Sequence, residues 1–147
     1  IIIDAGGLYY IKEFGCPPNA IITPHPGEAA MLLDCSIEEL QKNRLEAAEE
    51  LYKKYNCLII LKGYQTIVFD GEAYQCTDGG PALSTAGTGD VLAGLIGSFL
   101  AQGLSKTDAA KFSVAIHGAA GDKFSRNKRI RGLTATKLIK IINEEML

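Results

Sequence analysis

The residues with the clearest chemical potential form a glycine-rich loop, Thr85-Ala86-Gly87-Thr88-Gly89-Asp90, which leads into a helix of small residues. The free N–H groups and positive dipole of a helix start attract phosphate, and glycines allow its close approach. Asp90 is unfavourable beside phosphate unless it takes a proton from the attacking group or holds a metal. The spacing alone is equally compatible with a simple turn at Gly87 and Gly89, with Asp90 as an ordinary acid of the first helical turn.

Two further segments that could do chemistry are Thr23-Pro24-His25-Pro26-Gly27-Glu28 and Lys62-Gly63-Tyr64-Gln65-Thr66. Both follow predicted strands, where open α/β sheets bind their ligands. The prolines order the first loop, so that His25 and Glu28 could face one cavity, although a lone loop histidine is more often a surface residue. Lys62 is a candidate charge for phosphate, but a plain turn between strands explains the same residues.

The elements that must position these residues alternate between apolar strands and helical patterns, which predicts an α/β fold with a mostly parallel sheet. The Asp70-Gly71 pair predicts a β-hairpin, and Ser36-Ile37-Glu38-Glu39 has the spacing of a capping box that opens a long helix. Strands are expected at residues 1–4, 20–23, 57–61, 66–69 and 72–76, and helices at residues 8–14, 28–33, 36–55, 88–102, 106–124 and 134–145.

Composition indicates an ordinary globular domain. The chain has 147 residues, 47% of them hydrophobic and 22% charged, which predicts a single domain over residues 1–147. A net charge of -2 gives no reason to expect nucleic acid or an anionic membrane as a partner. No apolar run is long enough to span a bilayer. The basic segment at residues 125–131 is interpreted as a solvated connection rather than a phosphate site.

The four cysteines are interpreted as reduced, mostly buried thiols of a cytoplasmic protein. They form no C-x-x-C pair and have no paired histidines at metal spacing, so neither a zinc site nor a redox motif is indicated. The first residues, Ile1-Ile2-Ile3-Asp4, begin without Met and have the pattern of a buried strand already under way. We therefore expect the chain to be a fragment.

Four motifs in order give the chain a family resemblance: Pro24-His25-Pro26-Gly27-Glu28, Leu61-Lys62-Gly63-Tyr64-Gln65-Thr66, Ala86-Gly87-Thr88-Gly89-Asp90-Val91-Leu92-Ala93-Gly94 and His117-Gly118-Ala119-Ala120-Gly121-Asp122. Together they resemble the ADP-dependent NAD(P)H-hydrate dehydratases, which are repair enzymes with a ribokinase-like fold. The resemblance runs over essentially the whole chain and corresponds to roughly the C-terminal half of that family's domain.

The resemblance implies roles for particular residues. Asp90 would be the catalytic base that also contacts the substrate, and His25 would bind the hydrated nicotinamide nucleotide. Glu28 resembles the acidic residue that ribokinase-like proteins use near Mg²⁺, usually through water. The residues that would line the adenine nucleotide site are Lys62, Gly63, Tyr64, Gln65, Thr66, Gly87, Thr88 and Gly89.

The implied reaction uses ADP as co-substrate with Mg²⁺. Asp90 would deprotonate the 6-hydroxyl group of the hydrated ring (NAD(P)HX), and that oxygen would attack the terminal phosphorus of ADP. Expulsion of phosphate would restore NADH or NADPH and leave AMP. The family also implies a homo-oligomer, such as a tetramer, and an epimerase domain that can precede this one.

Two departures from the family pattern accompany the resemblance. Gly6 stands where the family usually carries a second acid, and the first half of the family domain is missing. We therefore expect an exposed apolar edge and face, and an isolated chain without activity.

Two alternatives stay open. A ribokinase-like kinase for a vitamin precursor or sugar would use the same loop and Asp90 but would release a stable phosphorylated product. A non-catalytic, nucleotide-binding remnant would fit the missing half, although such a remnant should have lost Asp90 or its flanking glycines early.

Overall fold

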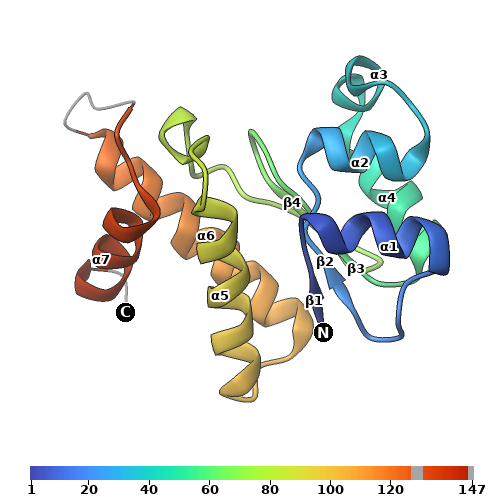
Figure 1. Ribbon diagram of the computed structural model, residues 1–147. Coiled ribbons are helices and arrows are strands. Elements are labelled where there is room, and N and C mark those ends of the chain that lie inside the picture. The colour runs from blue at the N-terminus through green and yellow to red at the C-terminus, as the bar shows by residue number, and fades with distance from the viewer. Residues whose placement is uncertain (127–130, 146–147) are drawn as a thin grey trace. The chain divides into compact units, whose positions relative to one another are not determined.

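The computed structural model describes residues 1–126 and 131–145, which fold into two compact units that divide between Gln75 and Cys76 (Figure 1). Most of the basic segment that the sequence predicts to be a solvated connection, residues 127–130, lies outside the described residues.

The first unit contains a five-stranded sheet whose spatial order follows the chain. Strands β1, β2 and β3 are parallel, whereas β4 is antiparallel to both β3 and β5, so that β5 runs in the direction of the first three. The sheet is therefore mostly parallel, and it ends in the predicted hairpin. Its strands are β1 (Ile2–Ile3), β2 (Ile21–Ile22), β3 (Leu58–Leu61), β4 (Ile67–Phe69) and β5 (Ala73–Gln75).

Four helices belong to the first unit: α1 (Gly6–Phe14), α2 (Pro26–Leu33), α3 (Ile37–Lys42) and α4 (Arg44–Tyr55). Alternate strand residues, Ile22, Ile59, Leu61, Ile67 and Phe69, share one buried core with these helices. The intervening residues Ile21, Leu58, Ile60 and Val68 are buried as well, which explains why these strands have continuous rather than alternating apolar patterns.

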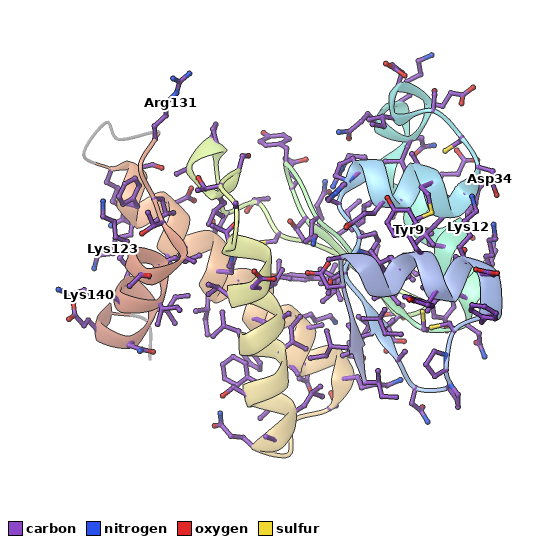
Figure 2. The ribbon with its side chains drawn as sticks, viewed as in Figure 1. Tyr9, Lys12, Asp34, Lys123, Arg131 and Lys140 are labelled. Atoms are coloured by element: carbon purple, nitrogen blue, oxygen red, sulfur yellow. The ribbon has the colours of Figure 1, made fainter. Side chains whose placement is uncertain are left out.

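An ion pair joins two helices of this layer at the surface. Lys12 of α1 pairs with Asp34, which ends α2, and also donates to the carbonyl of Met31 at 2.6 Å (Figure 2). Because both charges are partly exposed, this contact contributes little to stability.

The prediction of one helix over residues 36–55 is wrong, because the chain leaves the helical conformation at Asn43. Ser36 does open α3 with the predicted capping box. Asn43 (φ -142°, ψ 76°) then accepts from the N–H of Glu46 at 3.3 Å and caps a second helix. Asparagine favours such caps because its side chain bonds to nearby backbone. The break makes Arg44 the first residue of α4.

The second unit is helical, and α5 (Thr88–Ala101), α6 (Lys106–Ser125) and α7 (Ala135–Glu145) confirm the three predicted helices. The sequence did not predict the short 3₁₀ helix η1 (Pro81–Leu83) that precedes them. Its core includes Ala82, Ala120, Leu133, Leu138 and Ile142. Two glycines of α6 allow the segment before η1, and η1 itself, to lie directly on the helix. A Cβ atom at Gly118 would lie 2.7 Å from the carbonyl oxygen of Asp78, and one at Gly121 would lie 2.6 Å from Cγ of Leu83.

All four cysteines are free, but only two are fully buried. Cys57 and Cys76 are buried, whereas Cys16 and Cys35 are partly exposed. The Cys76 thiol donates to the carbonyl of Val114 at 3.8 Å, and burial raises its pKa. No helix within the described ranges is long and apolar enough to cross a membrane.

Candidate functional site

The carboxyl ends of β1, β2 and β3 meet at one edge of the sheet and bring polar residues together there. The N–H of Thr23 donates to the carbonyl of Ile3 at 3.1 Å, and the N–H of Lys62 donates to that of Pro24 at 2.9 Å. Asp4 follows β1 directly. This strand-end edge, which comprises Asp4, Thr23, His25, Glu28 and Lys62, is the place where open α/β sheets bind ligands.

Lys62 is already paired at this edge. Its Nζ lies 2.7 Å from Oδ1 of Asp4, and the two side chains are only 19% and 17% exposed. Burial by itself would raise the pKa of Asp4, but the hydrogen bond and charge of Lys62 outweigh it and hold that pKa below its ordinary value. The lysine predicted as a charge for phosphate therefore carries its own counter-charge. Sequence reasoning did not identify Asp4 as that partner, although its place after a strand of the same sheet is a usable signal.

His25 and Glu28 lie together because they form the capping box of α2. Nδ1 of His25 accepts from the N–H groups of Gly27 at 3.0 Å and Glu28 at 3.2 Å, and the Glu28 carboxylate accepts from the His25 N–H at 2.8 Å. Because Nδ1 is an acceptor, the proton of the neutral ring lies on Nε2, 3.5 Å from Oε1 of Glu28. The imidazole is 57% exposed, so Nε2–H is a donor that a ligand can reach.

The turn after β3, residues 62–66, is held in a defined conformation. Gly63 (φ 132°) and Gln65 (φ 53°) both have positive φ. The Thr66 hydroxyl donates to the carbonyl of Gly63 at 3.0 Å, and Gln75 donates to the side chain of Gln65 at 2.9 Å. Tyr64 is 77% exposed. These hydrogen bonds hold the turn in place, and the ring of Tyr64 is exposed to solvent.

Arg44, which was not predicted as a site residue, holds the start of this turn through hydrogen bonds to backbone carbonyls. Its Nη2 lies 3.2 Å from the carbonyl oxygens of both Leu61 and Lys62. The signal that could have located it is the helix break at Asn43, which the pattern of residues 36–55 concealed.

The glycine-rich loop lies in the second unit and leads into α5. Gly87 is the N-cap residue of this helix, and its φ of 86° suits glycine. The Thr88 hydroxyl donates to the carbonyls of Leu83 at 2.6 Å and Thr85 at 2.8 Å. His117 of α6 donates from Nε2 to the Thr88 carbonyl at 2.9 Å. The loop is therefore fixed on both sides.

The start of α5 has no side-chain cap among the described residues. The N–H of Thr88 already bonds to the Thr85 carbonyl at 3.3 Å, whereas the N–H groups of Gly89 and Asp90 have no partner within the helix and are the donors that an anion needs. Asp90, the third residue of α5, is exposed, and within residues 1–126 and 131–145 its side chain forms no hydrogen bond or ion pair. This carboxylate is therefore available to a ligand.

The motif of residues 117–122 has a structural explanation on α6. His117 bonds to the loop at Thr88. The absence of side chains at Gly118 and Gly121 lets the segment that precedes the loop lie against α6. Asp122 accepts from the N–H of Gly79 at 3.0 Å. The motif thus supports the loop rather than adding reactive groups to it.

The predicted site residues accordingly form two groups. His25, Glu28 and Lys62 meet at the strand-end edge of the first unit, with residues 63–66 in the turn that follows, whereas residues 87–90 form the loop of the second unit. Within the described residues, no group of three or more His, Cys, Asp or Glu side chains could hold a metal ion. Glu28 is nearly buried, with 9% of its surface exposed, and its carboxylate bonds to the N–H of His25.

Comparison with known families gives one match over nearly the whole chain. Residues 1–144 match the Carb_kinase model, described as NAD(P)H-hydrate dehydratase. The bifunctional NAD(P)H-hydrate repair enzyme Nnr of Vibrio cholerae is 40% identical over 143 residues, covering 96% of this chain and 29% of that protein. The ADP-dependent (S)-NAD(P)H-hydrate dehydratase of Neisseria meningitidis is 41% identical and covers 94% of this chain and 50% of that protein. The chain thus spans half or less of the length of these relatives.

Solved structures give the same result for the fold. The ADP/ATP-dependent NAD(P)H-hydrate dehydratase of Bacillus subtilis, co-crystallised with ATP/Mg²⁺, has a TM-score of 0.89 at 33% identity and covers 97% of this chain and 52% of that one. A ribokinase-like superfamily protein of Enterococcus faecalis has a TM-score of 0.82 at 28% identity and covers 97% of this chain and 50% of that one. The predicted ribokinase-like fold is confirmed.

Proposed function

We propose, because the chain belongs to the NAD(P)H-hydrate dehydratase family, that it carries catalytic and nucleotide-binding residues of an enzyme that dehydrates the S-epimer of hydrated NAD(P)H. ADP is the co-substrate, and the products are NAD(P)H, AMP and phosphate. One observation carries the proposal: Asp90 is exposed, and its carboxylate has no partner among the described residues, at the start of a helix that none of their side chains caps. A base beside an anion site is what phosphoryl transfer to a hydroxyl group requires.

Asp90 acts as the base in this proposal. Its carboxylate takes the proton of the 6-hydroxyl group, the oxygen bonds to the terminal phosphorus of ADP, and the bond to AMP breaks. The lone pair of the ring nitrogen then expels phosphate. Loss of a proton from the ring carbon next to the one that carried the phosphate restores the dihydropyridine. Phosphate is a far better leaving group than hydroxide, which is why the nucleotide is needed.

The loop binds the transferred phosphoryl group. The N–H groups of Gly89 and Asp90 stabilise the charge that develops on phosphorus oxygens, and Gly87 and Thr88 shape the approach. The fixed bonds from Thr88 and His117 support this role because a preorganised donor set does not reorganise during reaction.

His25 orients the nicotinamide ring and residues 62–66 line the adenine nucleotide. The exposed Nε2–H of His25 is suited to a hydrogen bond with a carbonyl or hydroxyl group of the substrate. The exposed Tyr64 and the open backbone of the turn suit contact with a nucleotide. Because Lys62 is paired with Asp4, it donates to a phosphate as part of an ion pair rather than as an isolated charge.

Glu28 fits Mg²⁺ only as an indirect ligand. Mg²⁺ keeps several waters and is commonly held by one or two carboxylates together with substrate phosphates, so a solitary carboxylate suffices. When bound, the ion would neutralise phosphate charge. Glu28 is already an acceptor for the His25 N–H, which favours contact through water.

The wider assignments belong to the same proposal. The two units would form one domain over residues 1–147, in a cytoplasmic homo-oligomer that has an epimerase domain in the intact protein. Relatives described as bifunctional support the last point.

The decisive experiment follows NADH recovery from hydrated NADH with ADP and Mg²⁺. It uses this chain with and without the N-terminal portion of the Neisseria meningitidis relative. We expect NADH, AMP and phosphate in equal amounts from the completed protein. A stable phosphorylated product would identify a kinase instead, and ADP binding without turnover would identify a non-catalytic remnant.

A further inference from the structure

Arg44 contacts the turn of residues 62–66 through backbone carbonyls. Its Nη2 lies 3.2 Å from the carbonyl oxygens of Leu61 and Lys62, and its Nη1 donates to Oε1 of Gln41 at 3.0 Å. The guanidinium group therefore fixes the last residue of β3 and the first residue of the turn to the start of α4. The three bonds come from two nitrogens held in one plane, whereas an ammonium group carries its three donors on a single nitrogen and has no such fixed geometry.

Gly63 leaves room for this guanidinium group. A Cβ atom at Gly63 would lie 3.0 Å from Nη1 and 3.2 Å from Nη2 of Arg44. The planar group thus packs directly beneath the turn, where any larger residue at position 63 would displace it. The glycine of the Lys62-Gly63 motif is explained by Arg44 as well as by its positive φ.

The charge of Arg44 has no carboxylate partner within the part of the chain that the structure describes. All its hydrogen-bond acceptors are neutral, and across residues 1–126 and 131–145 no carboxylate pairs with it. Nε is buried without a hydrogen bond. Burial lowers the pKa of Arg44, yet arginine stays charged at neutral pH. Arg44 is half-buried, and partial burial of a charge without a counter-ion is costly, whereas Lys62 has Asp4 as its counter-ion.

We propose that Arg44 is a positioning residue for the nucleotide, holding the turn of residues 62–66 and supplying the net positive potential that attracts the ADP phosphates. The proposal rests on the function proposed above. Lys62 contributes little net charge because Asp4 neutralises it. The positive charge of Arg44, which lies against the carbonyls of the turn, therefore offsets the negative charge of the phosphates bound at that turn. The phosphates in turn compensate the desolvation of Arg44.

Gln41 offers a way to separate charge from geometry. Gln41→Glu places a carboxylate at the acceptor of Nη1, so the three bonds persist while the charge of Arg44 is neutralised. Arg44→Met removes both the bonds and the charge. Lys42→Met is the matched control, because Lys42 lines the same cleft of about 390 Å³ beside Arg44 but makes no hydrogen bond to the turn.

Calorimetry on the completed protein should compare binding of ADP and of adenosine, at low and high salt. We expect both Gln41→Glu and Arg44→Met to weaken ADP binding by about threefold to tenfold, and Lys42→Met to change it by less than about twofold. Gln41→Glu should leave adenosine binding unchanged, and its effect on ADP should shrink at high salt. In turnover, KM for ADP should rise more than kcat falls.

Different failures have different meanings. If Gln41→Glu binds ADP as the unchanged protein does, the charge of Arg44 is irrelevant and the inference is overturned, even if Arg44→Met fails to fold. Equal losses for ADP and adenosine would also overturn it, because they would indicate a purely structural role. Absence of ADP binding in the unchanged protein would instead overturn the proposed function.

Discussion

The strand-end edge of the first unit and the glycine-rich loop of the second differ in where their polar groups find partners. At the edge, Asp4 pairs with Lys62, and His25 and Glu28 bond to one another. At the loop, hydrogen bonds fix the backbone around Thr88, but among the described residues the Asp90 carboxylate has no partner and α5 has no side-chain cap.

This difference indicates a division of work. Groups that already bond to protein atoms are positioned in advance, so they can orient a ligand without losing freedom when it binds. A carboxylate without a partner is free to accept a proton. The edge therefore suits recognition, and the loop suits the chemical step.

The largest expected effect comes from removing the free carboxylate. Asp90→Asn should lower kcat for dehydration by about 10²- to 10⁴-fold while ADP binding is retained, because a general base contributes about that much. Asp108→Asn is a matched control, since Asp108 is also the third residue of its helix, α6, but interacts with Ser105 at the helix cap. If both variants lost activity equally, Asp90 would be only a helix-start acid, and the contrast between loop and edge would fail.

A smaller effect is expected from breaking the pair at the edge. Asp4→Asn leaves Lys62 mostly buried without its counter-charge and should lower the free energy of unfolding by about 1–3 kcal/mol at pH 7. Urea unfolding with and without the substitution measures this.

The pH dependence of that pair has a defined sign. Because the folded-state pKa of Asp4 lies below its ordinary value of 3.8, the contribution of Asp4 is present above about pH 4 and is lost as pH falls through the folded-state pKa. The difference between the unchanged protein and Asp4→Asn should therefore shrink in acid. A difference that stayed constant from pH 7 to pH 3 would contradict a role for the charge of Asp4.

The smallest effect separates the two roles of His25. His25→Ala removes the cap of α2 and should cost about 0.5–2 kcal/mol of stability, whereas His25→Asn keeps a capping side chain and should cost little. Both variants lose the imidazole Nε2–H, so KM for the hydrated nucleotide should rise about tenfold in each. If His25→Asn kept the original KM, His25 would serve α2 alone.

Much of the fold follows from local sequence signals. Continuous apolar runs gave the strands of the parallel sheet, and the Asp70-Gly71 pair gave the hairpin. The end of α5 just before Gly103 and the capping box at Ser36 were also predictable from local sequence. The break at Asn43 was not, because the apolar spacing continues across it and a cap depends on one side chain turning back to the backbone.

The residues of the candidate site could be predicted from the sequence, but the hydrogen bonds and ion pairs between them could not. Loops that follow strands identified His25 and Lys62, because ligands of α/β folds bind there, and the glycine-rich start of a helix identified Asp90. That Lys62 pairs with Asp4 depends on which strands become neighbours, 58 residues apart in the chain. Arg44 escaped notice because its role is carried by carbonyl groups, which every residue has.

The two buried cysteines give each unit its own reporter of local opening. Cys57 and Cys76 are 3% and 2% exposed, one in each unit, so a thiol reagent reaches either of them only when the surrounding structure transiently separates. With Cys16 and Cys35 replaced by serine, the labelling rate of each remaining thiol, relative to that of an unfolded peptide, would report how often its unit opens. ADP, if it binds the glycine-rich loop, should slow labelling of Cys76, which is anchored to α6 beside that loop's supports.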